Sequence, residues 1–382
     1  MSQYPYRLLA PGPVPVPAAV LRAMSEKVLH HRTPQFQQIL KHVWLGLQNL
    51  FATRQPVMIL TGTGSAAMEA AVVNTLSPGD EALVVVSGKF GERWAEVCEI
   101  YGVKTHRWNL AWGQAANSDE FTAQLKQHPN VKAVFTQACE TSTATLHPVR
   151  AMAAAVKQTT PNALFIVDAI TAVGCMPLPM DEWQIDVMIA GSQKAFMIPT
   201  GLSFIALSEK AWAAQAKSQI KKFYLDVALE KKMNDKGDTH FSCPTPLVVG
   251  LHTVLERIER SNPDRMYKRC MMLAQATRAM GEALALKVYS NSPAPSVTAL
   301  LTPSDSAQIR DWLEKERGIT IMGGQDQLKG KILRIGHMGD VRDEDMLALL
   351  EALGEALNKG NEAAMFKNQL SFLLRSAEPL FL

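Results

Sequence analysis

The sequence is poor in cysteine, and the few cysteines are dispersed. No Cys-x-x-Cys pair occurs in the 382 residues. An odd, scattered set does not form a disulfide framework, and it lacks the clustered ligands of a structural zinc or iron–sulfur site. We therefore expect reduced thiols in a cytoplasmic protein. The five cysteines are Cys98, Cys139, Cys175, Cys243 and Cys270.

The sequence also lacks a strong charge excess and any long hydrophobic run. Its 39 Lys and Arg residues nearly balance 36 Asp and Glu residues, which gives no reason to expect nucleic acid or a membrane surface as a partner. No run reaches the roughly 20 apolar residues of a spanning helix, and the proline-rich residues 1–17 lack a signal-peptide core. We expect a soluble globular protein.

From about residue 57, short β-branched runs alternate with longer helical stretches, among them 65–76 and 90–101. This alternation predicts an α/β fold in which helices cover both faces of a mainly parallel, seven-stranded sheet. The predicted strands are 57–60, 82–86, 103–108, 131–136, 164–167, 187–190 and 202–207.

The pattern changes after about residue 254, where long helical stretches dominate and strands are expected only at 297–301 and 332–335. This part is predicted to form a smaller C-terminal α+β domain. The last segment is expected to be either a helix docked on the body or a subunit contact. The expected divisions are an N-terminal arm at the small domain and active-site edge (1–20), a large domain (21–254), a small domain (255–360) and a C-terminal extension (361–382).

Two chemically active residues follow successive predicted strands. Asp168 comes directly after 164–167, and Lys194 follows 187–190. Open α/β sheets bind ligands at this carboxyl edge. A lysine amine can hold an aldehyde cofactor, and a carboxylate can pair with a protonated pyridine nitrogen. Either residue alone would more often be structural, but the pair has complementary roles for one cofactor.

A glycine-containing turn, Thr61-Gly62-Thr63-Gly64-Ser65, joins a predicted strand to a predicted helix. Glycines let backbone N–H groups approach a phosphate, and a helix N-terminus favours its negative charge. The turn lacks the lysine of a P-loop, and Ala67 interrupts the G-x-G-x-x-G spacing. A tight turn without a ligand therefore remains equally open.

In their order along the chain, these motifs resemble those of the class V aminotransferases of fold-type I, especially the alanine–glyoxylate and serine–glyoxylate branch. The resemblance extends from Ala10-Pro11-Gly12-Pro13 to Ile332–Gly336. Among its members, the cyanobacterial-type group labelled as the small subunit of a soluble hydrogenase is the most similar. The resemblance implies that the large domain binds pyridoxal 5'-phosphate.

The resemblance also implies individual roles. Lys194 would form the Schiff base with the cofactor, and Asp168 would bind its pyridine nitrogen. Two departures from the family pattern are Phe90, where many members have tryptophan, and Ser65, where many have histidine, so one phosphate contact is expected to differ from theirs. The remaining implied contacts are Thr63, Gly64, Ser65 and Gln193 at the phosphate, Phe90 on the ring face, Ser142 at the ring hydroxyl, Arg334 at the substrate carboxylate and Gly12 beside the substrate.

The family pattern further implies a homodimer with a shared active site. A neighbouring subunit would add a hydroxyl donor to the phosphate. The alignment in this region leaves Ser242 and Thr245 as alternatives.

The function implied is ping-pong transfer of an amino group from a small amino acid, alanine or serine, to an oxo acid such as glyoxylate. A phosphonate-specific class V transaminase is an alternative, because it would keep every cofactor residue. A non-catalytic subunit of a redox complex is another, and it predicts a stoichiometric partner and no cofactor. A cysteine desulfurase is disfavoured because Cys270, the last cysteine, falls in a predicted helix.

Overall fold

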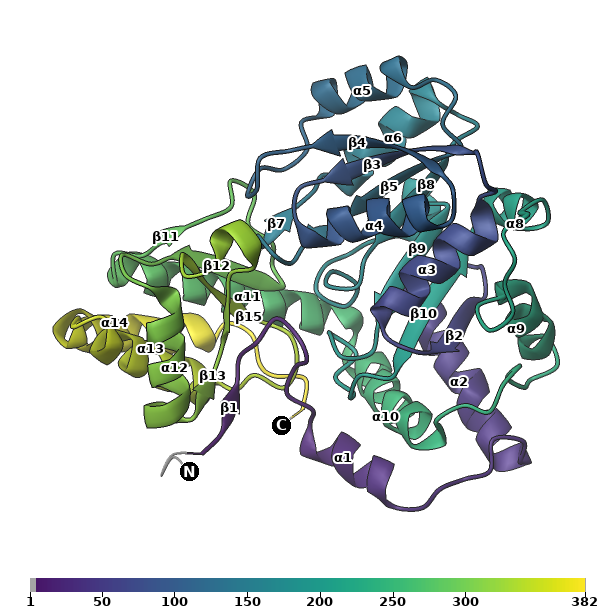
Figure 1. Cartoon of the computed structure of the whole chain (residues 1–382). Helices are drawn as coiled ribbons and strands as arrows, with labels where there is room; N and C mark the ends of the chain where they lie inside the picture. Colours follow the sequence, from purple (N-terminus) through teal and green to yellow (C-terminus); the bar gives the residue numbers. More distant parts are fainter. Residues whose placement is uncertain (1–4, 382) are drawn as a thin grey trace.

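A seven-stranded sheet forms the centre of the larger part of the molecule in a computed structural model, which describes residues 5–381 (Figure 1). Residues 1–4 of the expected arm and Leu382 of the expected extension lie outside the described residues. Only β10 runs antiparallel to its neighbours, so the predicted mainly parallel sheet is confirmed. Across the sheet the strands are β2 (Val57–Thr61), β10 (Leu202–Leu207), β9 (Val187–Gly191), β8 (Leu164–Asp168), β5 (Ala133–Gln137), β3 (Glu81–Val86) and β4 (Lys104–Asn109).

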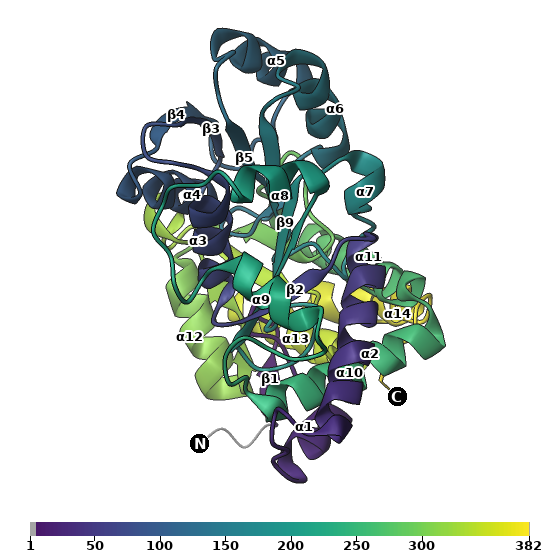
Figure 2. The same cartoon turned by 90° about the vertical axis from the view of Figure 1, so that its right-hand side faces the viewer.

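Helices cover both faces of this sheet. Alternate side chains of a strand point to opposite faces, so Val57 and Ile59 enter one apolar core while Met58 and Leu60 enter the other. Figure 2 shows α3 and α4 on one side and α2, α6 and α7 on the other. The helices of this part are α1 (Ala18–Ser25), α2 (Pro34–Phe51), α3 (Gly64–Thr75), α4 (Lys89–Ile100), α5 (Ser118–Gln127), α6 (Val149–Thr159), α7 (Met180–Trp183), α8 (Glu209–Gln215), α9 (Val227–Asn234) and α10 (Thr245–Ser261).

A smaller four-stranded antiparallel sheet and its helices form the second part, as the C-terminal α+β pattern predicts. The N-terminal arm lies with it, because β1 (Arg7–Leu8) pairs with β13 (Ile319–Thr320) (Figure 1). The elements are β11 (Lys287–Val288), β12 (Val297–Leu301), β15 (Ile332–Gly336), β14 (Met322–Gly323), α11 (Pro263–Ala283), α12 (Ser306–Arg317) and α13 (Asp343–Ala356). A short antiparallel hairpin of β6 (Cys139–Glu140) and β7 (Thr145–Leu146) follows β5 in the chain.

The C-terminal segment contains α14 (Gly360–Leu374), which packs on α11 and α13. Leu370 and Leu374 are buried in the core of the smaller part, so this segment is a helix docked on the body. Within residues 5–381 no helix is long and apolar enough to cross a membrane. All five cysteines are free, as their spacing predicts.

Candidate active site

Lys194 lies in a turn that begins where β9 ends. Ser192 fixes this turn, since its Oγ donates to the Pro199 carbonyl (2.8 Å) and accepts from the Leu202 N–H (3.2 Å). The Lys194 side chain is buried, and its Nζ donates to the Pro11 carbonyl at 2.5 Å. Burial lowers the pKa of Lys194 to about 8. About a tenth of this amine is therefore neutral and nucleophilic at pH 7, far more than for a lysine with the ordinary pKa of 10.5.

Gly12 packs directly against this amine. A Cβ at Gly12 would lie 2.3 Å from Lys194 Nζ, and the backbone there has φ +136°, a conformation that favours glycine. Gly12 is therefore in contact with the lysine, at a place where a larger residue does not fit.

Asp168 is the last residue of β8, the parallel neighbour of β9. Its Oδ1 accepts from the Ile170 N–H at 2.8 Å, whereas its Oδ2 accepts no hydrogen bond from any residue between 5 and 381. Burial raises the pKa of Asp168 to about 7, and the positive charge of Lys194 acts in the opposite direction. A buried carboxyl with a free oxygen is suited to pair with a cation.

Glu140 links the segment that contains Ser142 to the start of α4. It is fully buried and accepts from the backbone N–H groups of Phe90 and Gly91, each at 3.1 Å. It also accepts from Ser142 Oγ at 2.5 Å. Burial raises the pKa of Glu140, while these hydrogen bonds lower it. Glu140 thus fixes the relative positions of Phe90 and Ser142.

Arg334 lies in the middle of β15 and is buried. Its Nε donates to the Gly323 carbonyl (2.9 Å) and its Nη1 to the Thr141 carbonyl (3.0 Å). Burial lowers its pKa to about 10, and within the described chain no carboxylate forms an ion pair with it. A fixed, unpaired guanidinium is suited to a substrate carboxylate.

The turn before α3 has the features of an anion site. Gly64 is the first residue of α3, and the Thr63 side chain does not cap the helix. Ser65 Oγ accepts from Arg93 Nη1 at 3.1 Å, and the Arg93 guanidinium lies 5.1 Å from the centre of the Phe90 ring. A helix N-terminus beside an arginine favours negative charge.

The remaining predicted residues differ in their surroundings. Gln193 precedes the lysine, and its buried Oε1 has no hydrogen-bond partner among residues 5–381. Thr245 is buried at the start of α10, whereas Ser242 is exposed. In the described part of the chain, neither of these two hydroxyls forms a hydrogen bond with another predicted site residue.

Sequence reasoning did not assign roles to Glu140 and Arg93. Glu140 stands two residues before Ser142, but its bonds to the α4 backbone span some 50 residues of sequence. Arg93 follows Phe90 by three residues, a spacing that puts two side chains on one helix face. This helical spacing is the one feature of the sequence that indicates a place for Arg93 beside Phe90.

Comparison with known proteins gives the class. The family model of Aminotransferase class-V matches residues 8–342, so this chain belongs to the class V aminotransferase family. It is a pyridoxal-phosphate-dependent aminotransferase.

Individual relatives carry more specific names. The chain is 42% identical to a Synechococcus protein named soluble hydrogenase, small subunit, over 92% of each chain. It is 32% identical to a serine–glyoxylate aminotransferase of Methylorubrum extorquens, over 91% of this chain and 89% of the relative. The solved alanine–glyoxylate aminotransferase of Nostoc sp. is 27% identical with a TM-score of 0.88, covering 93% of this chain and 96% of that chain.

The side chains present fit this cofactor. The Asp168 side chain is buried, and within residues 5–381 its Oδ2 accepts no hydrogen bond, so this oxygen is free to accept one from a pyridinium N–H. The α3 N-terminus and Arg93 offer positive potential for a phosphate. The Lys194 amine, whose one hydrogen bond within the described residues is to the Pro11 carbonyl, is available to an aldehyde.

Proposed function

We propose that this chain transfers an amino group from a small amino acid, alanine or serine, to an oxo acid such as glyoxylate, by a ping-pong reaction. The observation that carries the proposal is the buried Lys194 amine, whose pKa is about 8, beside the buried carboxyl of Asp168. The names of the relatives support the substrate class, since serine–glyoxylate and alanine–glyoxylate aminotransferases are among them.

Bound pyridoxal phosphate supplies an aldehyde that condenses with amines and a ring that accepts electrons. Lys194 is proposed to hold the cofactor and to act as the base. Its neutral Nζ would take the α-proton of the amino donor and, once protonated, would give a proton back later in the reaction. Asp168 in its charged form would hold the cofactor by accepting a hydrogen bond from a protonated pyridine nitrogen.

The surrounding residues would orient the ring. Phe90 would cover one face of the ring, without the polar N–H of a tryptophan. Ser142, whose Oγ donates to Glu140, would contact the ring hydroxyl. The phosphate would be bound by Thr63, Gly64, Ser65 and Gln193.

Arg334 is proposed to bind the substrate carboxylate by parallel hydrogen bonds. Its Nε and Nη1 are fixed by the Gly323 and Thr141 carbonyls, so the guanidinium plane is set before substrate arrives. Preorganisation of this kind lowers the entropic cost of orienting the substrate. Gly12 would border the substrate at the Lys194 amine.

We further propose that the enzyme is a cytoplasmic homodimer. Phe223 and Tyr224 are exposed aromatics packed around Phe241, next to the exposed Ser242. Exposed aromatic clusters are typical of interfaces. Of the two candidate hydroxyls, Ser242 is accessible to a second subunit in this fold, whereas Thr245 is buried.

The test is a screen of half-reactions on the purified holoenzyme. Alanine, serine, aspartate and 2-aminoethylphosphonate are added separately, and loss of the cofactor's absorbance is followed. We expect alanine or serine to bleach the protein and glyoxylate or pyruvate to restore it, with Lys194→Ala inactive. Bleaching by 2-aminoethylphosphonate alone would instead support a phosphonate transaminase. A cofactor-free protein in stoichiometric complex with another chain would support a non-catalytic subunit.

A further inference from the structure

The segment from Ala377 to Phe381 follows α14 and returns to the larger part of the molecule. Three arginines of α10 and α11 bind its backbone carbonyls. Arg269 Nη1 donates to Ala377 (2.8 Å), Arg265 Nη2 to Pro379 (2.9 Å) and Arg257 Nε to Leu380 (2.8 Å). Arg265 also pairs with Glu378 at 3.0 Å.

This arginine clamp is anchored to the smaller part as well. Arg269 is buried, its Nη2 donates to the Val341 carbonyl at 2.8 Å, and its Nη1 pairs with Asp343 at 2.8 Å. A buried guanidinium with this many partners has little freedom to move. The path of the segment is therefore fixed by residues on both parts of the molecule.

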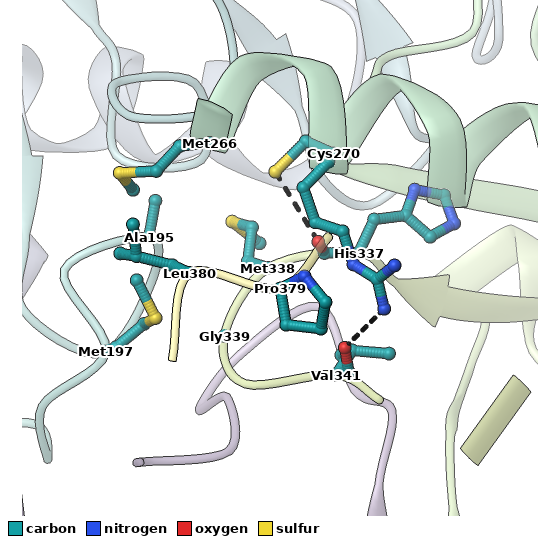
Figure 3. Close-up of a pocket in the computed structure, with 11 residues that line it drawn as sticks. Ala195, Met197, Met266, Cys270, His337, Met338, Gly339, Val341, Pro379 and Leu380 are labelled. Carbon is teal, nitrogen blue, oxygen red and sulfur yellow. Dashed lines mark hydrogen bonds between the residues drawn. The ribbon is translucent and has the colours of Figure 1, made fainter. Parts of the chain in front are cut away.

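The arginine clamp places Leu380 behind the turn that contains Lys194 (residues 192–198, called the lysine turn below). Leu380 is 7% exposed and belongs to the same apolar core as Ala195 and Met197. All three residues line a cavity of about 20 Å³, and Figure 3 shows their side chains around it. Ala195 adjoins Lys194, and the Met197 N–H donates to the Lys194 carbonyl at 3.0 Å.

The lysine turn is consequently supported from two directions. On the amine side, Gly12 and the Pro11 carbonyl hold Lys194 Nζ. Behind the turn, Ala195, Met197 and Leu380 line one small cavity within the same apolar core. Truncation of Leu380 would enlarge this cavity, and neighbouring atoms shift into voids only in part.

We propose that Leu380 is a positioning residue for Lys194, acting through Ala195 and Met197. The segment Ala377–Phe381, bound by Arg257, Arg265 and Arg269, is the strap that holds it in place. The effect of Leu380 on catalysis rests on the proposed role of Lys194. Its effect on the mobility of the lysine turn is independent of that role.

The first measurement is amide exchange in the cofactor-free protein, which is independent of activity. In Leu380→Ala the amides of Met197 and Ile198, which bond to Lys194 and Ser192, should exchange on the order of 10-fold faster. Leu370→Ala is the matched control, since it removes the same atoms from another buried leucine, which lies in the core of the smaller part. It should lower the melting temperature without this local effect.

The second measurement is steady-state kinetics of the holoenzyme. Leu380→Ala should lower kcat by up to about 100-fold while KM changes little, because the lysine is displaced and Arg334 is not. Leu380→Met, which keeps a large apolar side chain, should have amide exchange and kcat close to those of the wild type. Arg257→Gln removes the hydrogen bond from Arg257 to the Leu380 carbonyl and should give the same pattern more weakly, which keeps the test valid if Leu380→Ala does not fold.

Unchanged exchange at Met197 and Ile198 in both Leu380→Ala and Arg257→Gln would overturn the proposal, as would equal exchange and kcat effects in Leu370→Ala. Failure of the proposed function is distinguishable, because an inactive wild-type protein would still show the exchange difference.

Discussion

Substitution of Gly12 by alanine tests the contact between the N-terminal arm and the lysine. The new methyl group would lie 2.3 Å from Lys194 Nζ and 2.7 Å from its Cε. An ordinary contact is at least 3.4 Å, so the amine must move by about 1 Å. Lys194 Nζ would also lose its 2.5 Å hydrogen bond to the Pro11 carbonyl unless the arm moves with it.

Two effects of this change have to be separated. The backbone at Gly12 has φ +136°, which costs alanine about 1–3 kcal/mol of folding stability. The displacement of the amine acts on catalysis, where a misplacement of about 1 Å costs on the order of 100-fold in rate. Gly79→Ala is the matched control, because Gly79 has φ +86° but nothing lies within 4 Å of its Cβ position.

The assay compares kcat for the best amino donor with the melting temperature of each variant. We expect Gly12→Ala to lose about 100-fold in kcat, and Gly79→Ala to lose stability while keeping its kcat within about twofold of wild type. Equal kcat in the two variants would refute the steric argument.

Four further predictions follow from the burial and the hydrogen bonds of the site residues. Glu140→Gln replaces one carboxylate oxygen by an NH2 group, so either the Phe90 and Gly91 N–H groups, which share Oε2, or Ser142, which donates to Oε1, lose their acceptor. The free energy of unfolding should fall by about 1–3 kcal/mol and cofactor affinity should weaken. Calorimetry and cofactor titration check this, and no change in either contradicts it. In the cofactor-free protein, Lys194 labelling by an amine-reactive reagent should have a midpoint near pH 8, because burial lowers its pKa to about 8; a midpoint near that of an ordinary lysine contradicts it. For the same reason, the unfolded state binds more protons at Lys194, so the contribution of this residue to stability should rise with pH between about 8 and 10.5, and Lys194→Met should remove that rise. Arg334→Lys should raise KM for donor and acceptor by roughly 10- to 100-fold, since paired hydrogen bonds to a carboxylate are lost, and unchanged KM for both contradicts the assignment.

The sequence predicts those parts of the fold that have strong local patterns. The β-branched runs mark all seven strands of the large sheet, and the two strand ends place Asp168 and Lys194 at one edge. The same alternation of strands predicts nothing for Pro34–Phe51, which forms α2. Its apolar residues do recur at helical spacing and are buried, so that signal is present in the sequence.

Contacts between distant segments explain most of what the sequence does not predict. The bond from Lys194 to Pro11 spans 183 residues, and the bond from Arg334 to Thr141 spans 193. Nothing in the local pattern around either partner indicates such a contact. The hydrogen bonds of Glu140 are of the same kind, because they depend on how α4 meets the hairpin. The resemblance implies the roles of Lys194 and Arg334, but their hydrogen-bond partners are known only from the fold.

The identity of the lysine that carries the cofactor is the central claim, and covalent trapping tests it most directly. The holoenzyme is reduced with borohydride and digested, and the pyridoxyl group is located by mass spectrometry. We predict a single modified lysine, Lys194, and no modification in protein that an amino donor has first bleached. A pyridoxyl group on another lysine, or spread over several lysines, would contradict the account.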